Sequence, residues 1–260
     1  MATYKNLLVT KESPIAILTL NRPDRLNIFG VEVWQEMEQA LREIEEMDNL
    51  RALVINAKGK HFAAGVDLKE LKENSLNFTQ KYLAYLQSVY NKLDDFPVPV
   101  IIAIQGLCLG SGTELALACD LRVAAKNAKL ALPEVRFGLA PDMGGTTRLT
   151  KLVGPGQAKK IIFTCDQIDA EKAEAIGLVE YVVEEEELMD TAMKIAHQIA
   201  SMPPIAVRMA KKGINLATES SRMAGLLFEQ AQAALCSGTE DQKEAISAWF
   251  EKRNPEFKGK

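Results

Sequence analysis

The chain has 260 residues, of which 47% are hydrophobic and 25% are charged, and its formal net charge is −4. This is the composition of an ordinary globular protein, and the acidic balance argues against a nucleic-acid-binding protein. The N-terminus has no apolar signal core, and no apolar run approaches the roughly 20 residues of a membrane span. We therefore expect a cytoplasmic protein with no nucleic-acid or membrane partner.

The first half of the chain alternates between two patterns of apolar residues. Apolar runs bounded by turn signals predict strands, the first two joined as a hairpin, at 6–12, 15–23, 51–57 and 98–106. Apolar residues three and four positions apart predict helices at 31–47 and 77–96. Strands that alternate with helices pair in parallel, so this half predicts an α/β fold.

From about Ala170 onward the pattern becomes mostly helical. Three amphipathic segments follow one another closely, at 187–202, 204–217 and 223–235. The acidic run Glu184–Glu187 suits the start of a helix, where negative charge interacts favourably with the helix dipole. The pattern therefore predicts an α/β core followed by a helical region.

The cysteines and histidines argue against several kinds of site. No CxxC pair is present, and the surroundings of the cysteines predict buried free thiols at Cys108, Cys119, Cys165 and Cys236. The two histidines, His61 and His197, are far apart in sequence. Neither has the spacing of a metal site, and no G-x-S-x-G motif of a serine hydrolase is present.

The glycine-rich stretch "GLCLGSGTELALACD", Gly106 to Asp120, does not match the nucleotide-binding motifs. Gly110 and Gly112 fit G-x-G-x-x-G, but Leu115 takes the third glycine's place, and the chain has no P-loop motif. Its notable feature is Glu114, a charge inside a small, apolar run. A carboxylate in such surroundings is costly unless it is paired or used.

Two turns offer backbone N–H groups at the start of a predicted helix. "HFAAGVDLKEL" contains Gly65 and then Val66, and "LGSGTE" precedes the segment that carries Glu114. Two such turns can direct two N–H donors at one oxygen, which is an oxyanion hole. Taken singly, each turn is also compatible with an ordinary connection between a strand and a helix.

Two more carboxylates lie in the stretch "LALPEVRFGLAPDMGGTTRL". Glu134 follows Pro133, and Asp142 follows Pro141, both in apolar surroundings. Carboxylates held near each other in apolar walls can differ in pKa, so that one donates a proton while the other accepts one. The alternative is that Glu134 and Asp142 are surface charges or helix caps.

Together these stretches resemble the crotonase superfamily, the enoyl-CoA hydratase/isomerase family. The matching segments span nearly the whole chain: "LNRPDRLN", "HFAAGVDLKEL", "QGLCLGSGTELALACDLRVAA", "LALPEVRFGLAPDMGGTTRL", "EAIGLVEYVV" and "AISAWFEKRNPEF". The resemblance implies a crotonase-like ββα spiral core with a CoA-thioester site over residues 1–195. It also implies a C-terminal helical trimerisation region over 196–260, and hence a homotrimer or homohexamer.

The resemblance also assigns the site residues by position. The oxyanion donors would be the N–H groups of Val66 and Ser111, although many hydratases have glycine in place of this serine. Glu114 and Glu134 would be the catalytic glutamates that handle the water and the α-proton. The substrate would be an acyl-CoA thioester, so that no metal or redox cofactor is needed and coenzyme A belongs to the substrate. The residues implied to bind CoA are Ala64, Val66, Asp67, Leu68, Lys69, Lys252 and Arg253, the last two reaching the site from another subunit.

Asp142 departs from the pattern of many hydratases, which carry glycine there, whereas several isomerases of the family carry aspartate. The resemblance therefore implies an enoyl-CoA hydratase as the first expectation. An enoyl-CoA or dienoyl-CoA isomerase, or another CoA-thioester reaction that uses Asp142, is the alternative. A binding protein without activity is disfavoured because both glutamates are present. The acyl chain length does not follow from the sequence.

Overall fold

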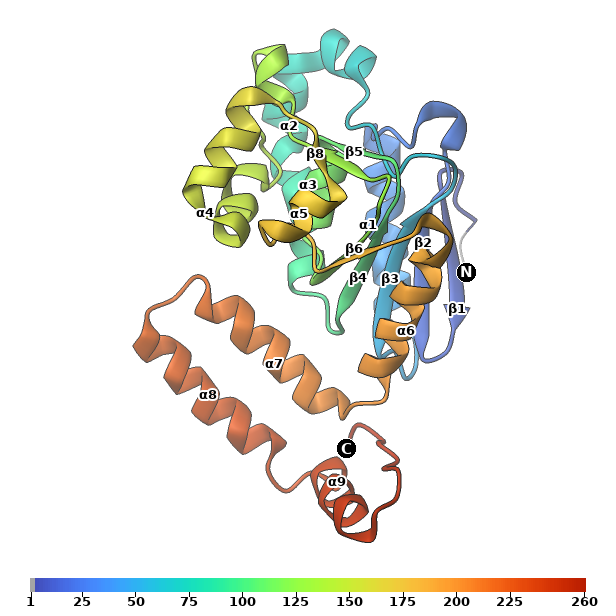
Figure 1. Ribbon diagram of the computed structural model, residues 1–260, viewed down its shortest axis with the longest axis vertical. Coiled ribbons are helices and arrows are strands. Elements are labelled where there is room, and N and C mark those ends of the chain that lie inside the picture. Colours follow the sequence, from blue (N-terminus) through green and yellow to red (C-terminus); the bar gives the residue numbers. More distant parts are fainter. Residues whose placement is uncertain (1–2) are drawn as a thin grey trace.

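The computed structural model describes residues 3–260, except for the side chains of residues 74–80 (Figure 1). The described chain forms a six-stranded main sheet in the order β1-β2-β3-β4-β6-β9 and a three-stranded sheet in the order β5-β7-β8. The main sheet contains β1 (Leu7–Glu12), β2 (Ile15–Leu20), β3 (Ala52–Ala57), β4 (Val100–Ile104), β6 (Leu121–Ala125) and β9 (Tyr181–Val183). The small sheet contains β5 (Leu107–Leu109), β7 (Lys129–Ala131) and β8 (Ile168–Asp169).

The pairing of the main sheet follows the sequence pattern. β1 and β2 form the predicted antiparallel hairpin, in which Leu7 lies opposite Leu20. Every later pair of neighbours in this sheet is parallel. All residues of β2 and β4 are buried, as expected for strands that are covered on both faces. The predicted parallel α/β arrangement is confirmed.

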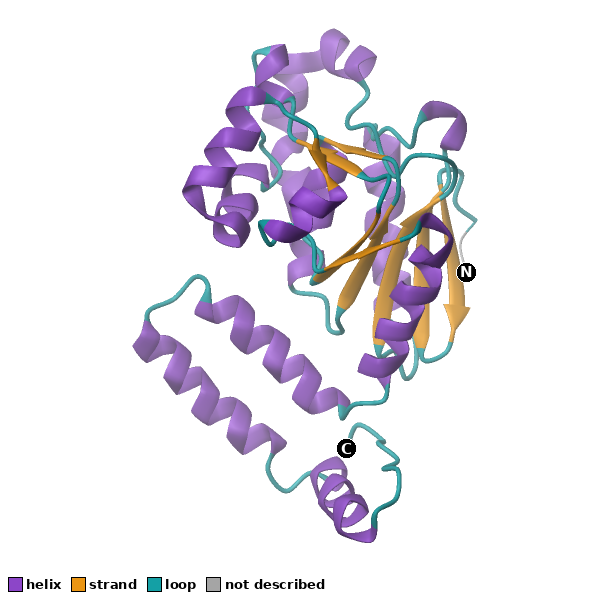
Figure 2. Ribbon diagram, viewed as in Figure 1, coloured by secondary structure: helices purple, strands orange, loops and turns teal. Residues whose placement is uncertain are grey.

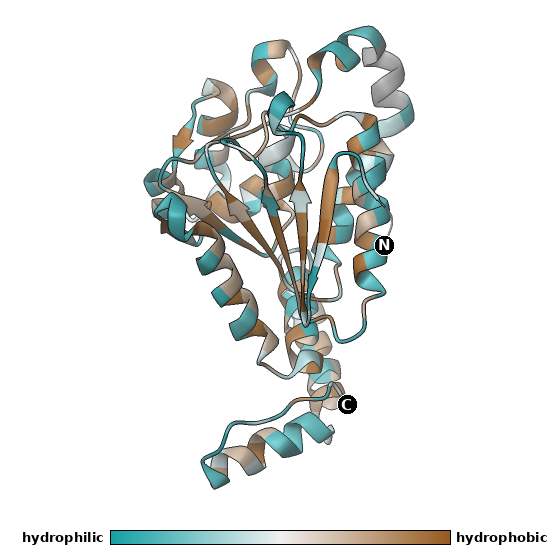
Figure 3. Ribbon diagram, turned by 90° about the vertical axis from the view of Figure 1, so that its right-hand side faces the viewer, coloured by the Kyte–Doolittle hydropathy of each residue, from teal (hydrophilic) through white to brown (hydrophobic). Residues whose placement is uncertain are grey.

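Helices cover both faces of the main sheet (Figures 1 and 2). α1 (Val31–Glu45) and α2 (Leu68–Asp94) pack on one face, and α6 (Leu188–Ala200) packs on the other. The predicted apolar face of α1 is confirmed, because Val33, Met37, Leu41 and Ile44 are all buried. Figure 3 shows the matching apolar character of the central strands. Each large side chain that is fully buried contributes roughly 1.5–3 kcal/mol, and this burial holds the layers together.

α2 joins two segments that the sequence pattern treated separately, the helix start after Val66 and the helix at 77–96. The expected helix at 77–96 is the second part of one continuous helix that starts at Leu68. Asp67 caps this helix, since its side chain accepts hydrogen bonds from the N–H groups of Lys69 and Glu70. The capped end lies directly after Val66, so the local sequence "GVDLKE" places a helix N-terminus at one of the two predicted donor turns.

Short elements between the sheets carry the remaining candidate residues. These elements are α3 (Ser111–Leu117), η2 (Glu134–Phe137) and α4 (Gly145–Thr164). The helical turn η1 (Pro23–Arg25) lies earlier in the chain. The sequence pattern did not predict the five-residue β6, nor β5, β7, β8 and β9, which are two or three residues long. β5 pairs with β7 in parallel, and this pairing brings the start of α3 close to the segment that leads into η2.

The C-terminal part is helical, as predicted. It contains α5 (Ala170–Ala175), the turn η3 (Glu185–Glu187), α6, α7 (Pro204–Ala217), α8 (Arg222–Cys236) and α9 (Glu240–Glu251). α7 to α9 extend away from the sheets (Figure 1). The expected division at residue 195/196 falls inside α6, which packs on the main sheet. No helix in the described part of the chain is both long and apolar enough to cross a membrane.

Lys211 anchors α7 to the core. Its ammonium group is buried and donates to the carbonyls of Leu93 and Val98, at 3.0 and 3.2 Å, and to the carboxylate of Asp120 at 2.7 Å. α8 lies outside α7 and buries none of its side chains.

The cysteines largely follow their prediction. Cys108, Cys119 and Cys165 are buried free thiols, and burial raises the pKa of the Cys108 thiol to about 12. The prediction is wrong for Cys236, which is only partly buried, because it ends α8, a helix without a buried face.

Candidate active site

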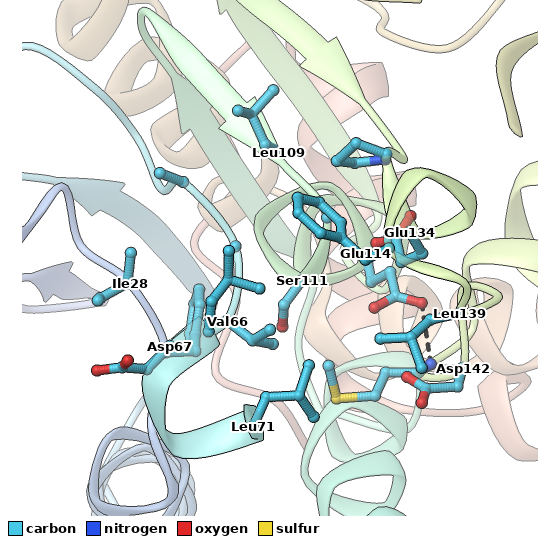
Figure 4. Close-up of a pocket in the computed structure, with 18 of the residues that line it drawn as sticks. Ile28, Val66, Asp67, Leu71, Leu109, Ser111, Glu114, Glu134, Leu139 and Asp142 are labelled. Carbon is cyan, nitrogen blue, oxygen red and sulfur yellow. Dashed lines mark hydrogen bonds between the residues drawn. The ribbon is translucent and has the colours of Figure 1, made fainter. Parts of the chain in front are cut away.

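One cavity of about 710 Å³ collects most of the candidate residues (Figure 4). Its walls come from the turn before α2, the start of α3, η2, and the loop that leads into α4. Among the predicted residues, the cavity is lined by Ala64, Val66, Asp67, Leu68, Lys69, Ser111, Glu114, Glu134 and Asp142.

The two predicted donor turns meet in this cavity. The N–H of Ala63 donates to the carbonyl of Leu107, and the N–H of Leu109 donates back to Ala63, so the two segments run side by side. Gly65 and Gly110 then come into close contact, since a Cβ on Gly110 would lie 3.7 Å from the Cα of Gly65. Both glycines have positive φ values, 92° and 53°, which side-chain-bearing residues rarely adopt. Glycine is therefore required for the close approach of the two turns.

In each turn the predicted donor, the N–H of Val66 or of Ser111, has no hydrogen-bond acceptor among the described residues. The N–H of Phe29 donates to the carbonyl of Gly65, and the N–H of Asp67 donates to the carbonyl of Phe29. Because successive N–H groups of an extended segment alternate in direction, the N–H of Val66 points away from Phe29. Ser111 is the first residue of α3, and the first N–H groups of a helix have no acceptor within it. Both residues line the cavity. The arrangement is compatible with two backbone donors that serve one oxygen.

Glu114 is the buried carboxylate of the site. It lies in α3 and is 1% exposed. Its Oε1 accepts hydrogen bonds from the N–H groups of Met143, at 2.9 Å, and Gly145, at 3.0 Å. Burial raises the pKa of Glu114 to about 7, and the charge of Glu134 acts in the same direction, whereas the two N–H groups oppose it. One carboxylate oxygen is thus fixed by backbone.

Glu134 faces the same cavity from η2 (Figure 4). Its Oε2 is buried and has no hydrogen-bond partner among the described residues. Burial raises the pKa of Glu134 to about 7, and the charge of Asp142 adds to this effect. A buried carboxylate oxygen without a partner is costly, so it marks a place where a further group is expected to bind.

Asp142 lines the cavity next to this pair but is exposed. Partial burial of its carboxyl raises the pKa above the usual value for aspartate. It does not cap α4, as one sequence-based alternative proposed, because the cap position is taken by Gly144 and no side chain bonds there. The alternative that Asp142 is a surface loop charge agrees with its exposure, but both Glu134 and Asp142 line one cavity with Glu114.

The hydroxyl of Ser111 has a partner of its own. Its Oγ lies 2.7 Å from the hydroxyl of Tyr90, which also donates to the Ser111 carbonyl at 3.1 Å. Tyr90 is completely buried in α2. The serine side chain therefore connects the start of α3 to α2, and its backbone N–H remains the candidate donor.

The residues predicted to bind CoA fall into two groups. Ala64 to Lys69 line the cavity, but the carboxylate of Asp67 is engaged by its own helix and by Arg25, whose Nη2 lies 3.1 Å away. Lys252 and Arg253 follow α9 and do not line this cavity. Arg253 pairs with Glu244 and Glu251 in the same chain.

Sequence reasoning missed several residues of the site. Arg25 and Arg136 line the cavity, and Met143 and Gly145 hold Glu114. All four stand in segments that carry the family resemblance, Arg25 in "LNRPDRLN" and the other three in "LALPEVRFGLAPDMGGTTRL". His61 is used by the backbone, because its Nδ1 accepts a hydrogen bond from the N–H of Leu107. Among the described residues, no group of three or more His, Cys, Asp or Glu side chains is arranged to hold a metal ion.

Comparisons with known proteins place the chain in a family. The enoyl-CoA hydratase/isomerase family model matches residues 10–260. The chain is 41% identical over 252 residues to the short-chain-enoyl-CoA hydratase of Clostridium acetobutylicum, covering 96% of this chain and 97% of the relative. It is 38% identical over 255 residues to the crotonyl-CoA hydratase of Syntrophomonas wolfei, covering 98% of both chains.

A solved structure agrees with these relatives. The crystal structure of an enoyl-CoA hydratase from Bacillus anthracis superposes with a TM-score of 0.95 at 36% identity, covering 98% of this chain and 100% of that chain. The predicted crotonase-like fold is confirmed. By sequence over nearly its whole length and by fold, the chain belongs to the enoyl-CoA hydratase/isomerase family.

Proposed function

We propose that the protein is an enoyl-CoA hydratase, which adds water reversibly and in syn fashion to the double bond of a trans-2-enoyl-CoA. The observation that carries the proposal is the pair Glu114 and Glu134, a buried residue and a partly buried one whose Oε2 is buried, which line one cavity beside the turns of Val66 and Ser111. The names of the relatives from Clostridium acetobutylicum and Syntrophomonas wolfei support the same activity.

The two backbone donors activate the thioester. When water attacks C3, negative charge develops on the thioester oxygen as an enolate forms. The N–H groups of Val66 and Ser111 stabilise this charge, and loss of one such donor costs roughly 3–4 kcal/mol of transition-state stabilisation. The donors belong to the backbone, and Gly65 and Gly110 allow the turns to approach each other, so the hole is preorganised by the fold.

The carboxyl groups move the protons. Glu114 holds the water and accepts its proton as oxygen bonds to C3, and Glu134 delivers a proton to C2. The two groups interact, so they titrate as a pair, and a pKa of about 7 for both keeps one protonated and one ionised near neutral pH. General acid–base catalysis of this kind contributes about 10²–10⁴-fold.

The substrate brings coenzyme A, and the mechanism needs no metal or redox cofactor. Lys69 lies at the cavity and provides a cation for the CoA phosphates. Lys252 and Arg253, which do not line the cavity of their own chain, provide cations from a neighbouring subunit, where Arg253 exchanges its ion pairs with Glu244 and Glu251 for a CoA phosphate.

The proposed assembly is a homotrimer or homohexamer in the cytoplasm. Its support is the apolar surface of the region after α6, where Trp249 is 82% and Phe250 is 80% exposed and α8 has no buried side chain. Exposed apolar groups gathered in one region are typical of a surface that binds another chain. Sedimentation should give a mass three or six times that of the chain, and a monomer would contradict the assembly.

Isomerisation of an enoyl-CoA or dienoyl-CoA is the second candidate function. The observation that favours it is Asp142, a third carboxyl group that lines the cavity and has a raised pKa. An isomerase needs an acid or base at a carbon beyond C2, and Asp142 provides one beside Glu134.

One experiment separates the two functions. The wild-type protein is given crotonyl-CoA, and hydration is followed by loss of absorbance of the conjugated double bond. A 3-enoyl-CoA and a 3,5-dienoyl-CoA are run in parallel to measure migration of the double bond. Rapid hydration of crotonyl-CoA is expected. Negligible hydration with rapid isomerisation that depends on Asp142 would overturn the hydratase proposal.

A further inference from the structure

The position of the Glu114 carboxylate depends on a short loop. Its two hydrogen-bond donors, the N–H groups of Met143 and Gly145, lie on either side of Gly144. Gly144 has a φ of 106°, and a Cβ on Gly145 would lie 2.8 Å from Glu114 Oε1. The loop fits closely around the carboxylate, so the conformation of this loop determines where the carboxylate lies.

Arg148 holds the loop from behind. Its Nη1 donates to the carbonyl of Met143 at 3.0 Å. A Cβ on Gly144 would lie 1.9 Å from the same nitrogen, so the guanidinium rests directly against the loop backbone. The side chain of Arg148 is only 15% exposed, and Arg148 is not among the described residues that line the cavity.

The other side of the guanidinium is fixed by α2. Arg148 Nε donates to Asp94 Oδ2 at 3.0 Å, and Nη2 bonds to Asp94 and, at 2.6 Å, to Asn91. A planar guanidinium with several fixed donors can hold two partners in one geometry, which an ammonium group cannot do. Arg148 therefore joins the loop around Glu114 to the C-terminal end of α2.

This end of α2 is itself held by α7. Asn215 Nδ2 donates to the carbonyl of Asp94 at 2.8 Å, and Lys211 Nζ donates to the carbonyl of Leu93 at 3.0 Å. The guanidinium thus bonds to a helix end that two side chains of another helix hold in place.

We propose that Arg148, anchored by Asp94, is a positioning residue that keeps the loop Met143–Gly145 in the conformation that orients Glu114 for catalysis. The inference rests on the proposed hydratase function. A purely structural role, in which Arg148 only joins α4 to α2, would predict a loss of stability without a change in the ionisation of Glu114.

The pH profile distinguishes these two roles. Glu134 from η2 and Asp142 from the loop before α4 raise the pKa of Glu114 by their charge, and the Met143 and Gly145 N–H groups lower it. If the loop shifts and these hydrogen bonds weaken, the pKa rises further. The limb of kcat/KM that requires ionised Glu114 then moves to higher pH.

The test compares Arg148→Met with wild type in the crotonyl-CoA assay. Misplacement of a catalytic group by about 1 Å can cost about 10²-fold, so we expect kcat to fall about 10- to 100-fold while KM stays within about threefold. The acidic limb of kcat/KM is expected to move up by about one pH unit. Arg148→Lys keeps the positive charge but not the planar guanidinium with its several fixed donors, and its kcat is expected to lie between those of wild type and Arg148→Met.

Lys151→Met is the matched control. Lys151 lies one turn further along α4 and forms an ion pair with Glu219, so this variant also removes a cation and an ion pair from the helix. Its kcat and pH profile are expected to equal those of wild type.

The outcomes are decisive in both directions. If wild type hydrates crotonyl-CoA but folded Arg148→Met keeps its kcat and its acidic limb, the positioning role is wrong and the proposed function stands. If wild type does not hydrate crotonyl-CoA, the proposed function itself fails. If Arg148→Met does not fold, Asp94→Asn is tested instead. This variant is expected to lower kcat about threefold to tenfold and to move the acidic limb of kcat/KM to higher pH. An unchanged acidic limb would overturn the inference.

Discussion

Replacing Glu114 by glutamine should separate the catalytic value of this residue from its effect on stability. Glutamine has the shape of glutamate, and its carbonyl oxygen can accept the hydrogen bonds from Met143 and Gly145 that Oε1 accepts in the wild type. The fold around the residue is therefore retained. What is lost is the ability to accept a proton from water, so kcat is expected to fall by at least about 10²-fold.

The same substitution is expected to stabilise the protein. Burial raises the pKa of Glu114 from 4.5 to about 7 in the folded chain. At roughly 1.4 kcal/mol per pH unit, holding this group ionised in the folded state costs at most about 3 kcal/mol. The cost is absent below pH 4.5, where the group is protonated in both states, grows as the pH rises to about 7, and is constant above it. Glutamine carries no such cost.

Two measurements check this reasoning. Turnover of crotonyl-CoA gives kcat, and urea unfolding at equal protein concentration gives the free energy of unfolding at pH 5 and at pH 8. Glu114→Gln should be nearly inactive, and its gain in stability over wild type should be larger at pH 8. Glu12→Gln, an exposed glutamate at the end of β1, is the control and should change neither quantity. Near-wild-type turnover, or a stability gain that does not grow with pH, would refute the role or the burial cost assigned to Glu114.

Four further substitutions test the other site residues. Glu134→Gln removes the donor of the C2 proton and should lower kcat by at least about 10²-fold; wild-type turnover would assign this proton to another group. Ser111→Gly keeps the backbone N–H and loses only a hydroxyl bonded to Tyr90, so its kcat should stay within about tenfold of wild type. Ser111→Pro removes the N–H and should be inactive, provided that circular dichroism shows the protein to be folded. An inactive but folded glycine variant would make the hydroxyl the working group. Asp142→Gly should retain hydration of crotonyl-CoA within about tenfold, and a larger loss would place Asp142 in the reaction.

Local sequence patterns predicted the parts of the fold that are governed by local spacing. The helix faces and the strands β1 to β4 follow from apolar patterns, and the two donor turns follow from glycines before helix starts, whereas β6 was not predicted. β5, β7 and β8 have two or three residues each, too few for a period to be detected, and they form because neighbouring strands pair with them. The start and the second part of α2 were predicted as separate helices, and the pattern did not show that one helix runs through both.

The environment of the site residues could be predicted only in part. Glu114 and Glu134 were found because a carboxylate in an apolar run is unusual, and the family motifs give the same positions. Their partners come from segments far away in sequence: Met143 is 29 residues from Glu114. The bond between Tyr90 and Ser111 spans 21 residues. Such contacts depend on how the elements pack, and a single sequence carries no pattern that pairs them.

α8 buries none of its side chains, so we expect this helix to unfold locally more easily than the core of the chain. An isolated helix of about 15 residues, the length of α8, is marginal in water, so the stability of α8 depends on what it packs against. Regions with few buried contacts unfold locally at low free energy, whereas a packed core opens close to the global free energy of unfolding. In a separated chain, hydrogen exchange at α8 is therefore expected to be fast while Glu114, in the buried α3, stays in place, and contact with another chain in the proposed assembly is expected to slow it.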